Sequence, residues 1–387
     1  MLSMSQKRLL ARFAGPAVLL GAVLAAALVG AIMLAALGAN PWTAYKALIE
    51  GAFGSVDAMA DSALKAMPLL LVGVGISIAF RAGVINIGGE GQIIAGALLS
   101  TMTALALPDL PRIVLIPLVL VVGAVGGGIW GGIAGALKAY AGVNEILSTI
   151  MLNIIAVQIM NLLLRGPLID PGEIERGSHI PQTERLSENA DFPIMPGGTR
   201  LHLGVIIAIL AAVVGYILLF RTTQGLRLRA VGHNPHASRY AGMPVKRNVV
   251  MALVYSGAFS GLAGVVLVFG SLGHRLTTDG GATTFTGAAG FNGIVAALFG
   301  GLHPLWTIPA SFLFGGLLVG ANAMQRAVQV PAALILALNG LIVVFVVSSI
   351  RARERLATWA SEMRVEDESS PPEPPDPDRE LVPETPG

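Results

Sequence analysis

Long stretches without a charged residue recur along this chain, and they constrain its fold more than any other feature. One of them runs from Phe13 to Tyr45. Only 12% of the 387 residues are charged and 54% are hydrophobic, against roughly 25% and 45–50% in an average soluble domain. So few charged side chains cannot cover the surface of a soluble protein of this size. The sequence therefore predicts an all-α integral membrane protein.

Ten apolar stretches are candidates for transmembrane helices, because about 20 apolar residues of helix cross a hydrocarbon core about 30 Å thick. Their expected limits are 13–37, 64–80, 91–107, 113–137, 146–164, 201–220, 248–271, 288–302, 305–323 and 331–350. The eighth stretch is short and glycine-rich, with Gly287, Gly290 and Gly293 at its start. These features indicate a broken or re-entrant segment that lines a cavity.

The placement of positive charge sets the expected orientation. Residues 1–12 form a basic leader, and the uncharged run after it is too long for a signal peptide, so we expect a retained helix. The loop 221–247 has six basic residues and no acid, which predicts a cytoplasmic position. The loop 165–200 has six acids against four arginines, which predicts an external one. Both termini are then cytoplasmic.

The chain divides into a transmembrane domain, expected over residues 13–350, and a cytoplasmic tail over 351–387. From about residue 361 the tail is rich in proline and acid, with nine acidic and two basic residues. Such a segment cannot bury enough apolar surface to offset the entropy lost on ordering. We expect it to be a disordered, solvated tail, with partner binding as the alternative.

An internal repeat is suggested by two similar passages. The fourth span contains Trp130-Gly-Gly-Ile-Ala-Gly-Ala-Leu and the ninth contains Phe314-Gly-Gly-Leu-Leu-Val-Gly-Ala, and each following span reaches a Leu-Asn pair, ending at Asn153 and Asn339. Because five is an odd number of membrane crossings, two copies that begin five spans apart have opposite orientations in the membrane. The sequence therefore predicts a 5+5 inverted repeat, which is the architecture of a transporter.

Catalytic and nucleotide-binding motifs are absent from the sequence. The dipeptide Gly-Lys does not occur, so the chain has no P-loop, and neither Gly-x-Ser-x-Gly nor His-Glu-x-x-His is present. There is no cysteine. His233 and His236 have a metal-like spacing without a third ligand, so a solvated loop is the better interpretation. We expect neither an enzyme nor a metal site.

Two polar segments interrupt the apolar pattern. In residues 80–92 glycines break the helix, and Glu90 and Gln92 begin the next one, where the helix dipole favours a carboxylate. Glu90 either forms a gate or wall of a transport route or caps a helix at the interface. In residues 142–149, Glu145 and Thr149 lie on one helical face. They either line a polar path or cap and pack the helix.

The third unusual segment, residues 225–242, lies in the basic loop. Asn234 is a good N-cap and Pro235 suits the first helical position, which predicts a short helix over about 235–241 that stops at Gly242. A short capped helix isolated in such a loop has no core of its own. We therefore expect it to dock onto a partner.

Together these segments resemble the permease subunits of bacterial ABC importers for nucleosides and simple sugars, within the superfamily of branched-chain amino acid permeases. The resemblance covers roughly residues 38–350. Its Gly-Gly-Glu-Gly-Gln92 and Asn144-Glu-Ile-Leu-Ser-Thr149 motifs favour the nucleoside branch. The motifs are Arg81-Ala-Gly-Val-Ile-Asn-Ile-Gly-Gly-Glu-Gly-Gln92, Gly142-Val-Asn-Glu-Ile-Leu-Ser-Thr-Ile-Met-Leu-Asn153, Leu228-Arg-Ala-Val-Gly-His-Asn-Pro-His-Ala-Ser-Arg-Tyr-Ala-Gly242, Asn40-Pro-Trp-Thr-Ala-Tyr-Lys-Ala-Leu and Gly290-Phe-Asn-Gly-Ile-Val-Ala-Ala-Leu.

The resemblance implies a multi-pass protein of the bacterial plasma (inner) membrane that acts with other chains. It implies a second permease subunit, identical or homologous, a cytoplasmic ABC ATPase that binds ATP and Mg²⁺, and an extracytoplasmic substrate-binding lipoprotein. This chain would bind no cofactor itself. The basic loop would contain the coupling helix that docks on the ATPase. The expected coupling residues are Asn234, Pro235, Ala237, Ser238, Arg239, Tyr240 and Gly242.

For the translocation path, neutral hydrogen-bonding side chains suit an uncharged nucleoside or sugar. The expected lining residues are Asn86, Glu90, Gln92, Asn144, Glu145, Thr149, Asn153, Asn292 and Asn339. Two alternatives stay open. One is a branched-chain amino acid ABC permease, although the lining shows little charge complementarity to an amino acid. The other is an ion-coupled secondary transporter that works without an ATPase, with Glu90 and Glu145 as proton or sodium sites.

Overall fold

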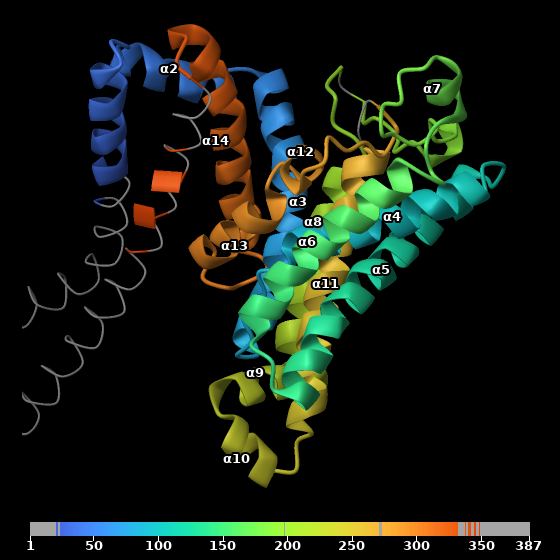
Figure 1. The fold of residues 1–387 in the computed structure, drawn as a ribbon. Coiled ribbons are helices and arrows are strands. Elements are labelled where there is room, and N and C mark those ends of the chain that lie inside the picture. Colours follow the sequence, from blue (N-terminus) through green and yellow to red (C-terminus); the bar gives the residue numbers. More distant parts are fainter. Residues whose placement is uncertain are drawn as a thin grey trace, which may run out of the picture. The chain divides into compact units, whose positions relative to one another are not determined.

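The computed structural model describes residues 21, 24–196, 198–270, 273–331 and six residues between 337 and 348. Its regular structure is helical (Figure 1), and among these residues strand-like pairing is limited to two isolated bridges. Residues 31–339 form one compact unit, which contains all the elements discussed below except the first part of the helix Leu24–Ala36. The leader 1–12, the tail 351–387 and Asn339 lie outside the described residues.

Six helices within the described part of the chain are long and apolar enough to cross a membrane, which confirms an α-helical membrane protein. They are α3 (Val56–Arg81), α5 (Arg112–Ala141), α6 (Glu145–Leu164), α8 (Gly204–Arg221), α11 (Val245–Phe269) and α14 (Thr307–Val328). Three more predicted spans coincide with the helix Leu24–Ala36, α4 (Gly89–Ala106) and α13 (Ala289–Phe299). The number ten stays a prediction.

The helix α13 has the short length expected of the eighth span. Its 11 residues reach about 16 Å at 1.5 Å per residue, roughly half of a hydrocarbon core. By contrast, α3 begins eight residues before the predicted start at position 64. The hydroxyl of Ser55 accepts a hydrogen bond from the backbone N–H of Ala58 (3.0 Å) and starts the helix there. The first turns of α3 contain charged residues, so the apolar pattern of the sequence did not predict them as helix.

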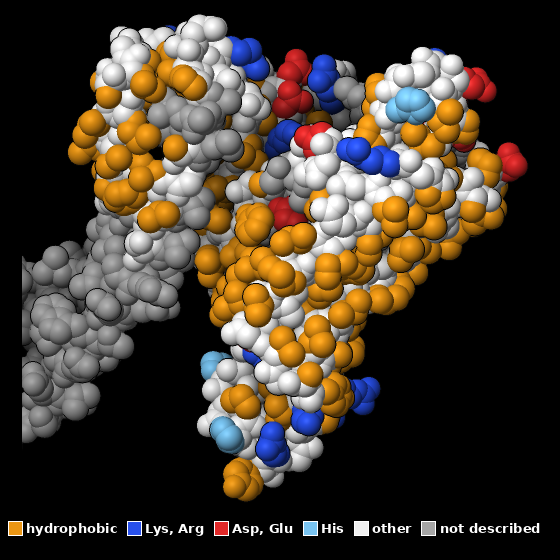
Figure 2. Space-filling model, viewed as in Figure 1, with side chains coloured by type: hydrophobic (Ala, Val, Ile, Leu, Met, Phe, Trp, Pro, Cys, Tyr) orange, Lys and Arg blue, Asp and Glu red, His pale blue; other side chains and the backbone are white. Residues whose placement is uncertain are grey.

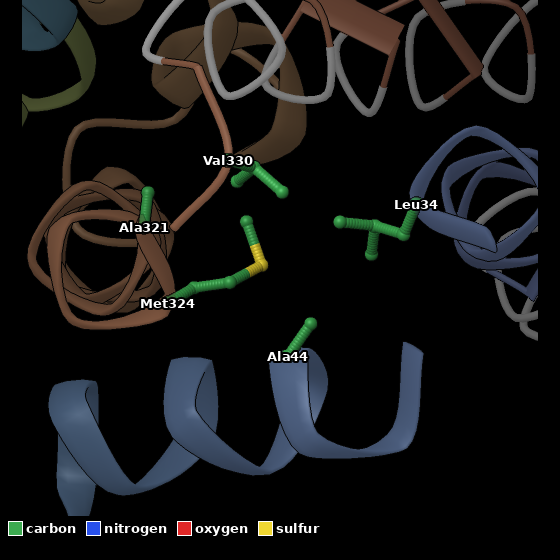
Figure 3. Close-up of a cluster of buried hydrophobic side chains, with 5 residues drawn as sticks. All are labelled: Leu34, Ala44, Ala321, Met324 and Val330. Carbon is green, nitrogen blue, oxygen red and sulfur yellow. The ribbon is translucent and has the colours of Figure 1, made fainter. Parts of the chain in front are cut away.

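The smaller helices lie at the ends of the long ones. They are α2 (Pro41–Phe53), α7 (Pro171–Glu175), η1 (Glu188–Ala190), α9 (Thr223–His233), α10 (Pro235–Tyr240) and α12 (Ala282–Thr286). The helix α2 packs on α14 through a buried apolar cluster (Figure 3). Met324 lies at its centre, between Leu34, Ala44, Ala321 and Val330.

The helices α4, α5 and α11 approach one another through glycine. A Cβ atom on Gly127 of α5 would overlap the carbonyl oxygen of Gly257 on α11, and one on Gly257 would overlap the carbonyl oxygen of Gly127. One turn further on, a Cβ on Gly96 of α4 would lie 2.8 Å from the carbonyl carbon of Gly261. Small residues let helix backbones touch in a bilayer, where packing and not the hydrophobic effect drives association. Three helices are thereby held at backbone contact.

Acidic side chains are unevenly distributed along the bundle. In Figure 2 apolar side chains cover the long helices on this face, the end with α9 and α10 shows lysine and arginine without acids, and the opposite end shows acidic and basic side chains together. We call the first end the basic end, and the second, which carries α7 and residues 165–203, the loop end (Figure 1).

At the loop end, residues 165–203 and 273–280 form one cap. The Asp170 carboxylate pairs with the guanidinium of Arg275 at 3.0 Å, and the Asp191 carboxylate contacts the His274 imidazole at 2.7 Å. Backbone hydrogen bonds run from Thr183 N–H to the carbonyl of Leu276 (3.0 Å). The two loops are separated by α8 and α11 in the chain, so this cap ties the ends of these helices together.

His202 is buried under this cap, beside the start of α8. Its Nδ1 accepts a hydrogen bond from the backbone N–H of Gly204 (3.1 Å), and its ring packs on Phe192. Burial disfavours the charged imidazolium, and electrostatic repulsion between the His202 and His274 rings adds to this, so the pKa of His202 falls to about 4. The folded protein therefore holds this histidine neutral.

We predict that replacing Gly127 with Ala destabilises the bundle by about 1–3 kcal/mol, because the new methyl group meets backbone that cannot rotate away. Thermal unfolding of the detergent-solubilised protein measures the loss. Gly128→Ala is the matched control, since its Cβ would come no closer than 3.3 Å to another helix. Equal melting temperatures for the two variants would contradict the close contact.

We predict that acid weakens the cap through His202. In the unfolded chain this histidine titrates near 6.5, so the unfolded state takes up the proton first and the free energy of unfolding falls as the pH drops from about 6.5 toward 4. His202→Asn keeps an acceptor for the Gly204 N–H but does not titrate. Its melting temperature should fall less between pH 7 and pH 5 than that of the wild type.

His179→Asn is the control for this pH series, because His179 is exposed and in the same loop. Its positive φ of 48° also suits asparagine. A pH dependence that is the same in the His202 variant, the His179 variant and the wild type would show that the buried imidazole is not responsible.

Candidate translocation and coupling sites

The glycine-rich segment between α3 and α4 breaks the helix, as the sequence predicts. α3 ends at Arg81, α4 begins at Gly89, and the backbone between them is non-helical. Gly83 has a φ of +73°, a left-handed conformation that favours glycine. Ala82, Val84, Asn86 and Gly88 of this segment are buried, so the free backbone groups around them need partners within the protein.

Asn86 supplies the first of these partners. Its Oδ1 accepts a hydrogen bond from the Gly88 N–H (2.8 Å), and its Nδ2 donates to Gln92 Oε1 (3.0 Å) and to the Ser256 hydroxyl on α11 (2.8 Å). The side chains of Asn86, Gln92 and Ser256 are all essentially inaccessible to solvent. Because each is satisfied internally, the network fixes the broken segment against α11.

The helix α6 holds the same segment from its other side. Asn153 accepts a hydrogen bond from the Gly91 N–H (2.8 Å) and donates to the carbonyl of Ile87 (2.9 Å). The hydroxyl of Thr149 accepts from the Ile87 N–H at 3.4 Å. One amide thus pairs with both a donor and an acceptor of the broken backbone, which explains why an asparagine is buried on an apolar helix.

Glu90 links the two interrupted helices. From the first turn of α4, its Oε1 accepts hydrogen bonds from the backbone N–H groups of Gly290 (2.9 Å) and Phe291 (3.3 Å) in the first turn of α13. A Cβ on Gly290 would lie 2.5 Å from the backbone nitrogen of Glu90. The carboxylate therefore sits at the positive ends of two helix dipoles, where negative charge is most stabilising.

Asn144, Glu145 and Asn292 do not join the side-chain network around Asn86 and Asn153, although the Glu145 carboxylate reaches the backbone of Ile85 in the same broken segment. Asn144 caps α6 through the Ile146 N–H (2.9 Å) and is exposed, while Glu145 forms an ion pair with Lys138 at the end of α5. Asn292 is half-buried in the first turn of α13, next to the exposed ring of Phe291. For all of these residues, and for Asn339, a role in translocation stays a prediction.

The short helix in the basic loop forms where the sequence predicts it. The side chain of Asn234 accepts a hydrogen bond from the Ala237 N–H (3.0 Å), Pro235 is the first residue of α10, and Gly242 follows with a φ of +78°. Of the expected coupling residues only Ser238 is buried, and Tyr240 is 95% exposed. The helix therefore presents Arg239 and Tyr240 to a possible partner.

Sequence reasoning missed two parts of these sites. Ser256, which completes the Asn86 network, lies in an apolar helix among small residues, and nothing in its neighbourhood distinguishes it from a packing residue. The helix α9 precedes α10 in the basic loop; Thr222, whose hydroxyl accepts from the Gly225 N–H (3.0 Å), is an N-cap signal that could have revealed it. Within the described residues no cluster of metal-ligating side chains occurs, and His233 and His236 are exposed.

A bundle of apolar helices, two of them interrupted and joined through buried polar groups, with a pair of short helices at its basic end, is the architecture of a membrane transport permease. Residues 58–347 match the family described as "Branched-chain amino acid transport system / permease component". The chain belongs to this family, and it is a transport subunit and not a catalytic one.

Three relatives are similar over most of the chain. The guanosine ABC transporter permease protein NupP of Bacillus subtilis is 36% identical over 84% of this chain and 90% of its own length. The nucleoside ABC transporter permease protein NupB of Lactococcus lactis is 36% identical over 77% and 82%. A glucose ABC transporter permease protein of Haloferax volcanii is 32% identical over 84% and 86%. No solved structure matches this chain significantly.

We predict that Glu90→Ala destabilises the protein by about 1–3 kcal/mol, because it leaves two backbone N–H groups without an acceptor. Glu90→Gln should cost less, since an amide oxygen can still accept while the charge is lost. Thermal unfolding in detergent compares them with Glu50→Ala, which removes an exposed carboxylate paired with Lys46. If the Glu90 and Glu50 variants were equally stable, the carboxylate would not hold α13.

Proposed function

We propose that this chain is the transmembrane permease subunit of an ATP-driven ABC importer for nucleosides or simple sugars. The observation that carries the proposal is the similarity to nucleoside and sugar ABC permeases over most of the chain. The sequence has no P-loop, so ATP and Mg²⁺ would bind on a partner ATPase. The family describes one component of a transport system, and we infer a second permease subunit and a substrate-binding lipoprotein as further partners.

The orientation follows from charge. With the basic end in the cytoplasm of a bacterial cell, α10 would face the ATPase and the cap at the loop end would face the binding protein. Both termini would then be cytoplasmic. Arg239 and Tyr240 are exposed on a helix outside the apolar bundle, which supports a docking role for α10 and not a packing role.

The inverted repeat gains support from helix packing. Under a five-span repeat, α5 corresponds to α14 and α11 corresponds to α3. α5 packs on α11, and α14 packs on α3. Glycines form both contacts, because a Cβ on Gly131 would overlap the Leu253 carbonyl and one on Gly315 would lie 2.5 Å from the Ser62 carbonyl. We infer that the route runs between the halves, beside α4 and α13, and opens by alternating access.

An ion-coupled transporter would need a carboxylate that can bind a proton or sodium ion. Glu90 already accepts two backbone hydrogen bonds and Glu145 is paired with Lys138. These contacts favour a neutral cargo driven by ATP. An amino acid would need charged groups in the route for its ammonium and carboxylate. The two charged side chains at the broken segment, Arg81 and Glu90, already bind backbone groups, and the other polar residues there are amides and hydroxyls.

Reconstitution tests the function. The full chain is co-expressed with its neighbouring permease, ATPase and binding-protein genes, and the complex is placed in liposomes. We expect ATP-dependent uptake of labelled guanosine that unlabelled nucleosides inhibit more strongly than ribose or leucine. Inhibition by leucine alone would establish the amino acid alternative, and uptake under an ion gradient without an ATPase would overturn the proposal.

We predict that Arg239→Glu or Tyr240→Glu abolishes uptake while the protein still inserts into the membrane, because an acid on α10 disrupts the docking surface. Membrane fractionation measures insertion, and co-purification measures binding of the ATPase. Arg247→Glu makes the same charge change at an exposed position of the same loop and should transport normally. Normal uptake by the Arg239 and Tyr240 variants would contradict the coupling role.

A further inference from the structure

Both ends of α13 are held by residues of one short segment, Arg81–Glu90. At the N-terminal end, Glu90 accepts from the N–H groups of Gly290 and Phe291. Just beyond the C-terminal end, Arg81 donates from Nε to the Leu302 carbonyl (2.6 Å) and from NH2 to the Gly301 carbonyl (3.1 Å). A negative charge at the start of a helix and a positive charge at its end both interact favourably with the partial charges of the helix macrodipole.

The same segment is in backbone contact with α9. A Cβ on Gly232 of α9 would overlap the carbonyl oxygen of Arg81 and would lie 2.8 Å from the backbone nitrogen of Gly83. A Cβ on Gly83 would in turn lie 3.1 Å from the Cα of Gly232. Two glycines thus let the turn after α3 rest directly on the helix that leads into α10, so neither can shift without pushing the other.

A ring of side chains strengthens this contact. The guanidinium carbons of Arg81 and Arg229 lie 5.2 Å and 5.1 Å from the ring centre of Phe220, which also stacks on His303 at 5.0 Å. Within the described residues neither arginine has a carboxylate at ion-pair distance. Both guanidinium groups therefore interact with the Phe220 ring, and the guanidinium of Arg81 also donates to the carbonyls after α13.

We propose that this segment transmits movement of α9 and α10 to α13, with Arg81 as the positioning residue that makes the link. The inference rests on the proposed function, because it assumes that an ATPase moves α10. Displacement of α9 acts on the turn Arg81–Gly83 through Gly232. Since Arg81 and Glu90 hold the two ends of α13, this short helix shifts as a unit beside the inferred route.

Uptake per ATP hydrolysed tests the link in the reconstituted complex. With guanosine as the probe, Arg81→Ala should leave ATPase binding and ATP hydrolysis intact while lowering uptake per ATP on the order of ten-fold. Gly232→Ala should act in the same direction without altering the guanidinium. Arg81→Lys should be intermediate, because one ammonium does not reproduce the planar fork.

Arg227→Ala is the matched control, since Arg227 is exposed on the same helix α9 and should leave the ratio unchanged. If Arg81→Ala kept the wild-type ratio, or lowered uptake, hydrolysis and assembly by the same factor, the residue would be merely structural and the proposal would be overturned. Failure of the unmodified chain to assemble with an ATPase would instead contradict the proposed function.

Distance measurements give a readout that does not depend on activity. The chain has no cysteine, so spin labels can be placed on Phe291→Cys in α13 and Ile129→Cys in α5, both exposed positions. ATP should change the distance between the labels in the complex, and Arg81→Ala should remove the change. A distance that is the same with and without ATP in the otherwise unmodified complex would overturn the proposal.

Discussion

The contact between the Glu90 carboxylate and the first turn of α13 is the interaction on which the interior depends. Two helices begin at the same place, and the N-termini of both carry partial positive charge and backbone donors without intrahelical partners. Without a shared anion these ends would repel each other and leave donors unsatisfied inside an apolar bundle. One carboxylate resolves both problems, which is why a buried acid is stable there despite the cost of removing it from water.

Around this contact, glycine packing brings the helices close together, and hydrogen-bond networks satisfy the polar groups buried between them. Glycines bring α4, α5 and α11 to backbone distance, so the bundle is dense without large side chains. The interruption between α3 and α4 then exposes backbone groups in the densest part of the molecule. Asn86 and Asn153 satisfy such groups, and Ser256 of α11 accepts a hydrogen bond from the Asn86 amide and so holds it in place. The result is a rigid centre, with the half-buried Asn292 and the exposed Phe291 at its edge.

Features set by neighbours in sequence were predictable. The N-cap Asn234, Pro235 and the terminator Gly242 define α10 within nine residues, and the apolar runs locate most helices because each stretch satisfies its own backbone. The same cap signal was present at Asn40-Pro41, where α2 begins, and was not used. The start of α3 was missed because a hydroxyl cap and charged residues, not hydrophobicity, determine it.

The sequence by itself determined that this is an α-helical membrane protein, that its helix breaks before Glu90, and that a capped helix stands in a basic loop, because each depends on hydropathy or local backbone chemistry. Only the tertiary structure decided which backbone groups the buried polar and charged side chains bind. Glu90 meets Gly290, 200 residues away, and Arg81 meets Leu302, 221 residues away. Such pairings depend on how helices stack, and no local pattern in the chain encodes which distant backbone a buried charge will reach.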